Sequence, residues 1–389
     1  MDYFEHWQMF LKENGMQPLQ EPPGMPVERM LGEHREFSEL LGFPEELLGE
    51  LDTAAGELLQ DSRALSTFLS AAHAILWEQS RGDYSTLYGL WHRFVRQTWG
   101  EKAPILLLLF FTSSVHRVCD WYRQQGISRE ILRDTLRDLW IWADHHRRHT
   151  GAWGLLEGGW LLNHYHFRLF RVGRLQYIAQ PYGLDYIILR NRRTGGLCAL
   201  AHTGMLLSAA GEIEERFPVT TAVLRETQDC WSGHPVQGGR VALAPQEYSK
   251  REWETVQDSG GVVLDMHIPE DGPLRQEECR ESMRRAQDFF AQCLGIQASG
   301  FTVTTWLMDE ALRRVLGASS NIRRFQDLYA MRLPTGLGQE QTIQRVFGDE
   351  WQRDVLHAPH TTSLQQGVLQ ALLDGEHFHE YAAFAPLIE

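Results

Sequence analysis

The chain has 389 residues, of which 43% are hydrophobic and 23% charged, as in an ordinary soluble globular protein. Because a single hydrophobic core rarely organises more than about 300 residues, this length predicts two domains. The formal net charge of -14 argues against a general nucleic-acid-binding function, which requires a basic face.

Cysteine usage and the N-terminal sequence predict a cytoplasmic protein. The cysteines are odd in number and none forms a C-x-x-C pair, which suits a reducing compartment better than a disulfide scaffold. The start, MDYFEHW, lacks the basic and apolar regions of a signal peptide. The longest apolar run, residues 103–115, is shorter than the roughly 20 residues of a membrane span. We therefore expect that run to be a buried helix, with no membrane partner.

Apolar residues recur at spacings of three and four through the first 150 residues, as on one face of a helix. The pattern is strongest over residues 64–79, 84–99, 103–125 and 128–146. We therefore predict an all-helical N-terminal domain over residues 1–155.

After about residue 155 the hydrophobic pattern changes to short, β-prone segments. Residues 166–180 alternate around Gly173, where we expect a bulge or bend. From residue 261 onward, strands alternate with helices, and Asp309 is expected to cap one of these helices. Residues 319–333 are expected to return as a strand. The prediction is an α+β fold class, with a mixed α/β domain over residues 156–389.

Several catalytic signatures are absent from the sequence. It contains no G-x-x-x-x-G-K-[ST] loop, no G-x-S-x-G elbow and no G-x-G-x-x-G after a strand, which disfavours ATPases, serine hydrolases and dinucleotide-binding enzymes. His145 and His149 are four residues apart on one helix and could ligate zinc. They lack the adjacent Glu of a metalloprotease and stand at a helix end, where cationic side chains are favoured. We predict no metal site.

The segment VVLDMHI, residues 262–268, is the strongest candidate for chemistry. Strand alternation places Asp265 and His267 on one face, opposite Leu264 and Met266. An acid and an imidazole on an otherwise apolar strand cost free energy unless they are partnered or used. A histidine satisfied structurally by Asp265 and a catalytic pair both remain open. The amphipathic helix that follows begins near Arg275, so its N-terminus lies close to the end of this strand and could bind a diphosphate.

Six short segments together resemble a bacterial family of N-acyltransferases, whose members pair a helical N-terminal domain with a GNAT-like C-terminal domain. LGFPEELLGEL (41–51) is similar to the N-terminal domain. The others are similar to the C-terminal domain: FRVGRLQY (170–177), SGHPV (232–236), VLDMHIPEDGPL (263–274), TWLMDEAL (305–312) and SSNIRRF (319–325).

The resemblance implies acyl-CoA as co-substrate and a small-molecule or peptide amine as acceptor. It implies that strand 262–268 splays from strand 301–308 to admit pantetheine, with His267 as general base and Asp265 orienting it. The residues that it implies for coenzyme A are Ile268, Gly272, Leu274, Arg275 and Asn321, and those for the acceptor are Arg174 and Trp306.

A second hypothesis is a GNAT-like ligand-binding or regulatory protein without turnover. The wider superfamily carries a Gln/Arg-x-x-Gly-x-Gly/Ala loop for the diphosphate, whereas this chain has PEDGPLRQ after the strand. RLPTGLG, residues 332–338, only approximates that loop and comes too late in the order. The choice between these hypotheses, and a homo-oligomeric state, stay open at the level of the sequence.

Overall fold

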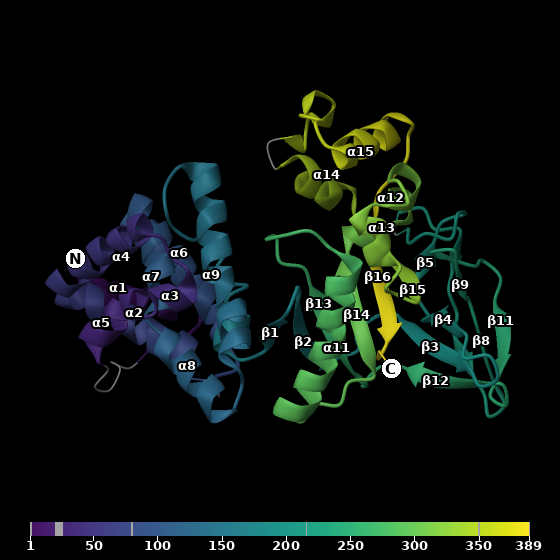
Figure 1. Ribbon diagram of the computed structural model, residues 1–389, viewed down its shortest axis with the longest axis horizontal. Helices are drawn as coiled ribbons and strands as arrows, with labels where there is room; N and C mark the ends of the chain where they lie inside the picture. Colours follow the sequence, from purple (N-terminus) through teal and green to yellow (C-terminus); the bar gives the residue numbers. More distant parts are fainter. Residues whose placement is uncertain (1, 20–25, 79–80, 215, 349–350, 389) are drawn as a thin grey trace. The chain divides into compact units, whose positions relative to one another are not determined.

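The computed structural model describes residues 2–19, 26–78, 81–214, 216–348 and 351–388. The chain forms two compact units (Figure 1). The first comprises Met1–Val172 with Pro269–Asp271, and the second comprises Gly173–Ile268 with Gly272–Glu389.

The first unit is helical, as the apolar spacing predicts. Its α-helices are α1 (Tyr3–Glu13), α2 (Val27–Glu36), α3 (Ser38–Leu41), α4 (Glu45–Gln60), α5 (Ser62–Ala72), α6 (Tyr84–Trp99), α7 (Ala103–Thr112), α8 (Val115–Gln124), α9 (Arg129–Thr150) and α10 (Leu162–Tyr165). Asp2, Asp61 and Ser128 cap α1, α5 and α9 through their side chains. The predicted domain boundary lies at residue 155, and α10 is a short further helix beyond it.

The apolar run 103–115 forms the buried helix α7 and its continuation, as expected. Leu107, Phe110 and Phe111 are fully buried. By length and composition, the stretch Tyr84–Gln124 is apolar enough to cross a membrane, but 67% of its most apolar window is buried. That stretch is also divided into α6, α7 and α8, and α6 packs against α7. We therefore interpret it as the core of the helical unit.

The main sheet is mixed and has the strand order β1-β2-β13-β14-β16-β15, and all of its strands except β1 belong to the second unit. β13 runs antiparallel to β2 and parallel to β14, and the pairs β14–β16 and β15–β16 are antiparallel. The bounds are β1 (Leu169–Val172), β2 (Leu175–Pro181), β13 (Val262–His267), β14 (Gly300–Thr305), β15 (Met331–Leu337) and β16 (His379–Pro386).

One face of this sheet is covered by α11 (Gln276–Cys293), which buries Cys279, Met283, Ala286 and Phe290. The chain between β14 and β16 carries α12 (Glu310–Val315), α13 (Asn321–Gln326), α14 (Gln339–Phe347) and α15 (Ser363–Leu373). Asp309 caps α12, as predicted.

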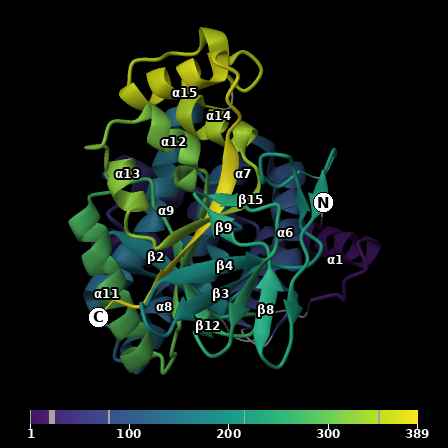
Figure 2. The same ribbon diagram turned by 90° about the vertical axis from the view of Figure 1, so that its right-hand side faces the viewer.

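An insertion of short strands between β2 and β13 covers part of the opposite face (Figure 2). Its two three-stranded sheets have the orders β12-β3-β4 and β11-β8-β7, and two further pairs are β5–β6 and β9–β10. The bounds are β3 (Tyr186–Asn191), β4 (Leu197–Ala201), β5 (Leu206–Leu207), β6 (Thr220–Thr221), β7 (Arg225–Glu226), β8 (Cys230–Gly233), β9 (Val236–Gln237), β10 (Arg240–Val241), β11 (Gln246–Ser249) and β12 (Trp253–Gln257).

The expected strand over residues 319–333 is wrong over most of its length. Residues Asn321–Gln326 form the helix α13, and the strand β15 begins only at Met331. The reason is the spacing of Ile322 and Phe325, which lie three residues apart and so share one face of a helix, where Phe325 is fully buried. RLPTGLG lies largely in β15 and is therefore not a phosphate-binding loop after a strand.

Candidate functional site

The two central parallel strands separate before they end. β13 pairs with β14 at Leu264↔Phe301 and Asp265↔Thr302. On its other edge β13 stays paired with β2 through His267↔Gln176, and β14 stays paired with β16 through Thr305↔Tyr381. The last residues of β13 and β14 therefore keep their outer partners while they diverge from each other. The sheet opens between them, as the resemblance implies.

The two faces of β13 lie in different surroundings. Leu264 and Met266 are buried on the face that α11 covers, where the Tyr329 hydroxyl contacts the Met266 sulfur at 2.9 Å. On the opposite face, Val263 is buried beneath the inserted strands. Further along that face Asp265 and His267 are only partly buried, so it is left partly uncovered where the strands diverge.

Asp265 connects His267 to the neighbouring strand. The His267 Nε2 lies 3.2 Å from Asp265 Oδ2, and the Thr302 hydroxyl donates a 2.8 Å hydrogen bond to Asp265 Oδ1. The His267 side chain is 33% exposed, against 16% for Asp265. The carboxylate is thus held from both sides, and the imidazole is the more accessible partner. This geometry suits a base whose orientation the carboxylate fixes.

Thr302 and Thr304 belong to this site, although sequence reasoning did not select them. They alternate onto the same face of β14 as Asp265 and His267 on β13, and Thr304 is exposed although its strand is central. The signal in the sequence was TVTTW, which places two hydroxyl groups on one face of a strand that is otherwise apolar.

The N-terminus of α11 follows β13 after a short loop and offers backbone N–H groups. Its N-cap residue, Arg275, makes no side-chain capping bond, and the helix is 18 residues long. These features favour an anion. The Arg275 guanidinium, however, pairs with Glu278 at 2.9 Å, and Glu277 and Glu278 place two carboxylates in the first turn. The cation expected for a diphosphate is therefore already partly neutralised.

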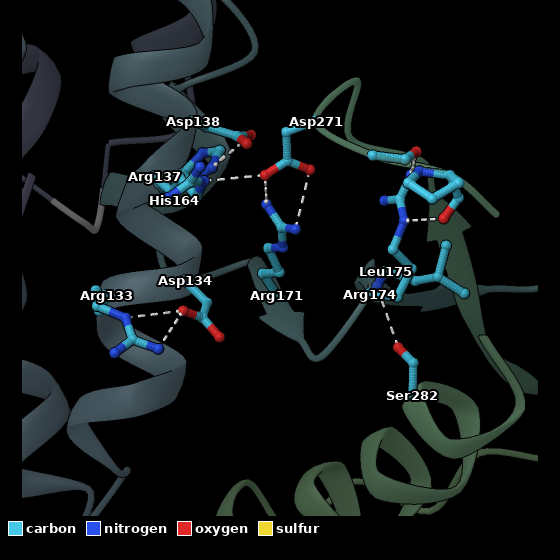
Figure 3. A network of polar contacts seen from close by, with 12 residues as sticks. Arg133, Asp134, Arg137, Asp138, His164, Arg171, Arg174, Leu175, Asp271 and Ser282 are labelled. Atoms are coloured by element: carbon cyan, nitrogen blue, oxygen red, sulfur yellow. Dashed lines mark hydrogen bonds and ion pairs between the residues drawn. The ribbon is translucent and has the colours of Figure 1, made fainter. Parts of the chain in front are cut away.

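Arginine side chains hydrogen-bond to the middle of the loop between β13 and α11 (Figure 3). In the first unit, Asp271 accepts two hydrogen bonds from the guanidinium of Arg171, at 2.8 and 3.0 Å, and one from Arg137 at 3.0 Å. The Asp271 carboxylate is thereby neutralised. In the second unit, Arg174 donates to the carbonyl oxygens of Gly272 and Pro273. Arg174 therefore positions the loop.

The remaining predicted residues fall around the same edge of the sheet. Ile268 follows β13 directly, and Leu274 is buried before α11. Trp306 begins the 3₁₀ turn η3 (Trp306–Met308) after β14 and packs on the core of α12, α14 and α15, and Asn321 begins α13. The structure brings Asp265 and His267 into contact, and it gives no direct contact between that pair and Asn321.

The histidines of α9 have local partners. His149 Nδ1 lies 2.8 Å from the carbonyl oxygen of His145, one turn earlier. In the part of the chain that the structure describes, no three His, Cys, Asp or Glu side chains are grouped so as to hold a metal ion.

Comparison with known proteins places the chain in a family. The N-acyltransferase N-terminal domain matches residues 32–167, and the GNAT-like C-terminal domain matches residues 169–384. A search of curated proteins finds no match.

The fold is similar to that of solved acyltransferases over all of both chains. One is an acyltransferase in complex with decanoyl-CoA and teicoplanin, at 21% identity and a TM-score of 0.62. Another is a mutant of the acyltransferase orf11* in complex with octanoyl-CoA, at 19% identity and a TM-score of 0.62. By its domain matches, the chain belongs to the acyltransferase family that joins an N-acyltransferase N-terminal domain to a GNAT-like C-terminal domain.

Proposed function

We propose that the protein is an acyl-CoA-dependent N-acyltransferase that uses the opening between β13 and β14. The observation that carries the proposal is the divergence of these strands after Asp265 and Thr302, with His267 partly exposed beside it. A narrow pantetheine chain could hydrogen-bond to strand backbone that has lost its partner. Similar structures hold octanoyl-CoA or decanoyl-CoA, which supports a medium-chain acyl group.

In this proposal His267 accepts a proton from the acceptor, because an amine attacks a carbonyl only as its free base. The reference pKa of imidazole, about 6.5, suits proton transfer near neutral pH. Asp265 positions the ring, and Thr302 positions Asp265. Bound acyl-CoA supplies the acyl group as a thioester: the C–N bond forms, the C–S bond breaks, and the thiolate leaves as coenzyme A.

The acceptor is an amine on a small molecule or peptide. Two of the similar structures contain teicoplanin or its 10C derivative, which supports a large amine-bearing acceptor.

The cysteines of the chain are all free, which supports a cytoplasmic enzyme.

Two substitutions separate catalysis from binding in this proposal. His267→Ala should lower turnover of decanoyl-CoA with an amine panel by roughly 100- to 10,000-fold, as expected for loss of a general base. Its affinity for decanoyl-CoA, measured by calorimetry, should change little. Arg275→Ala should instead weaken decanoyl-CoA binding with less effect on turnover at saturation. Full acyl transfer by His267→Ala would refute the catalytic assignment.

A binding protein without turnover is the second candidate. The paired Arg275 and the carboxylates of Glu277 and Glu278 favour it, because they weaken the α11 N-terminus as a diphosphate site. Tight binding of decanoyl-CoA without thiol release for any amine would select this candidate.

A further inference from the structure

The second unit contains a cavity of about 350 Å³ at the edge of the sheet. Three segments line it: Glu212 and Arg240 from the insertion, Asp309 to Arg314 at α12, and the residues from Asp374 to Tyr381 that lead into β16. This volume is at the small end of ligand pockets and would accommodate one substituent of a larger molecule.

Carboxylates dominate the lining of this cavity. The acids are Glu212, Asp309, Glu310, Asp374 and Glu376. Three of them pair with arginines: Glu212 with Arg240, Glu310 with Arg332 and Glu376 with Arg314. Asp309 is only 2% exposed. Its oxygens accept from the backbone N–H groups of Ala311 (2.8 Å) and His379 (2.7 Å). In the described chain no lysine or arginine forms an ion pair with Asp309. Burial raises its pKa, and the two backbone hydrogen bonds and the more distant charges of His379 and Arg314 only oppose that rise.

The Tyr381 hydroxyl is an independent sign of a ligand. Tyr381 is 3% exposed and lines the cavity, where its hydroxyl lies within the field of Asp309, Glu212 and Glu310. Within the described residues this hydroxyl makes no hydrogen bond. Tyr381 is thus a nearly buried side chain whose polar end reaches the cavity without a partner in the described chain, where a ligand could accept or donate a hydrogen bond.

The cavity and His267 lie at the same edge of the sheet. Tyr381 pairs with Thr305, the last residue of β14, and His267 is the last residue of β13. β14 lies between β13 and β16, and paired strands are about 4.8 Å apart. Because β13 and β14 diverge before His267, the two sites are at least about 10 Å apart. This is too far for an amine held in the cavity to be the one that His267 deprotonates.

We propose that this cavity binds an ammonium group of the acceptor other than the group that is acylated. The acceptor would then carry two amines at least about 10 Å apart, because β14 and the opening beside it separate the two sites. The ammonium would donate to the Tyr381 hydroxyl and to Asp309, the buried carboxylate that no arginine neutralises in the described chain. The binding of a cation in the cavity does not depend on the proposed function. The identification of that cation as part of the acceptor rests on the proposed function.

The first test is calorimetric titration of the full chain with 1,8-diaminooctane and 1,8-octanediol, without coenzyme A. The diamine should bind and the diol should not. Tyr381→Phe keeps the ring and removes only the unpartnered hydroxyl, so its fold should be intact. It should weaken diamine binding roughly 10- to 100-fold, as for loss of a hydrogen bond to a charged group. Glu247→Gln, an exposed acid on β11, is the matched control and should bind like the wild type.

Three results would overturn the inference. Equal binding of the diamine by wild type and Tyr381→Phe would exclude the cavity as its site. Equal heat from CaCl2 alone would indicate a metal site. The third concerns acylation from decanoyl-CoA, in which 1,8-diaminooctane should have a lower KM than 8-amino-1-octanol. Equal KM values for the two amines, or a difference that Tyr381→Phe retains, would overturn the link to the acceptor. If the diamine binds at Tyr381 but no amine is acylated, the proposed function fails, and the acceptor assignment fails with it.

Discussion

Gly173 joins β1 to β2 with a φ of +71°, in the left-handed region that side chains with a Cβ avoid. A Cβ there would meet Ser282 at 3.6 Å, an ordinary contact, so conformation and not space restricts the position. We expect Gly173→Val to destabilise the protein by about 1–2 kcal/mol, the cost of left-handed backbone. Its melting temperature should fall measurably. Gly317→Ala, at an open position with ordinary φ, is the control, and an unchanged melting temperature for Gly173→Val would show that this turn tolerates a side chain.

Residues on one strand were predictable from the sequence, and residues from distant segments were not. Asp265 and His267 follow from the period of two along β13, which fixes their common face. The bend at Gly173 follows from a glycine between two alternating segments. Tyr381 and Asp309 are 72 positions apart, and their proximity depends on how β16 returns beside β14. No local pattern encodes that return.

α11 is attached to β2 through one buried hydroxyl. Ser282 is 1% exposed, its Oγ accepts from the Leu175 N–H at 3.1 Å, and it lies 2.8 Å from the Tyr177 hydroxyl. Ser282→Ala should cost about 1–3 kcal/mol, because buried polar groups on β2 lose their partner. Chemical denaturation would measure this loss. Gln292→Ala, at an exposed position of the same helix, is the control and should change stability little. Equal stability of the Ser282→Ala and Gln292→Ala variants would contradict the role of Ser282 in holding α11 to β2.

Helices with strong periodicity were predictable element by element, whereas the small sheets of the insertion were not. The expected helices at 84–99 and 128–146 correspond to α6 and α9, because apolar spacing and capping agree there. Strands such as β5 and β9 have two residues each, too few to show a period. The helix α13 was missed because six residues give less than two turns of pattern.

The helical unit should lose stability as the pH falls from 7.5 to 5.5. Burial lowers the pKa of His34, His92, His146 and His166 below 6.5. The unfolded chain therefore binds protons more readily than the folded chain in this range, so acid favours unfolding. Burial raises the pKa of Glu33, which acts in the opposite direction, but one carboxyl opposes four imidazoles.

Thermal unfolding followed by tryptophan fluorescence would measure this pH dependence. Nine of the thirteen tryptophans lie in the helical unit, so the signal reports mainly on it. His166 donates from Nε2 to the Ile75 carbonyl at 2.8 Å, and His166→Gln could preserve that bond without titrating. The variant should show a shallower fall in melting temperature. A wild-type melting temperature that rises towards pH 5.5 would contradict the assignment.

At the scale of the whole molecule, His267, the proposed base, lies beside the opening between β13 and β14, and the central proposal is that this opening binds acyl-CoA. Calorimetric titration of the full chain with decanoyl-CoA tests it most directly, with Thr304→Phe as the variant that fills the opening. Thr304 is exposed, so the substitution should leave the melting temperature unchanged. We predict binding by the wild type, and binding by Thr304→Phe that is weaker by about 10-fold or more, the equivalent of 1.4 kcal/mol. No binding by the wild type at millimolar decanoyl-CoA, or equal binding by both proteins, would contradict the claim.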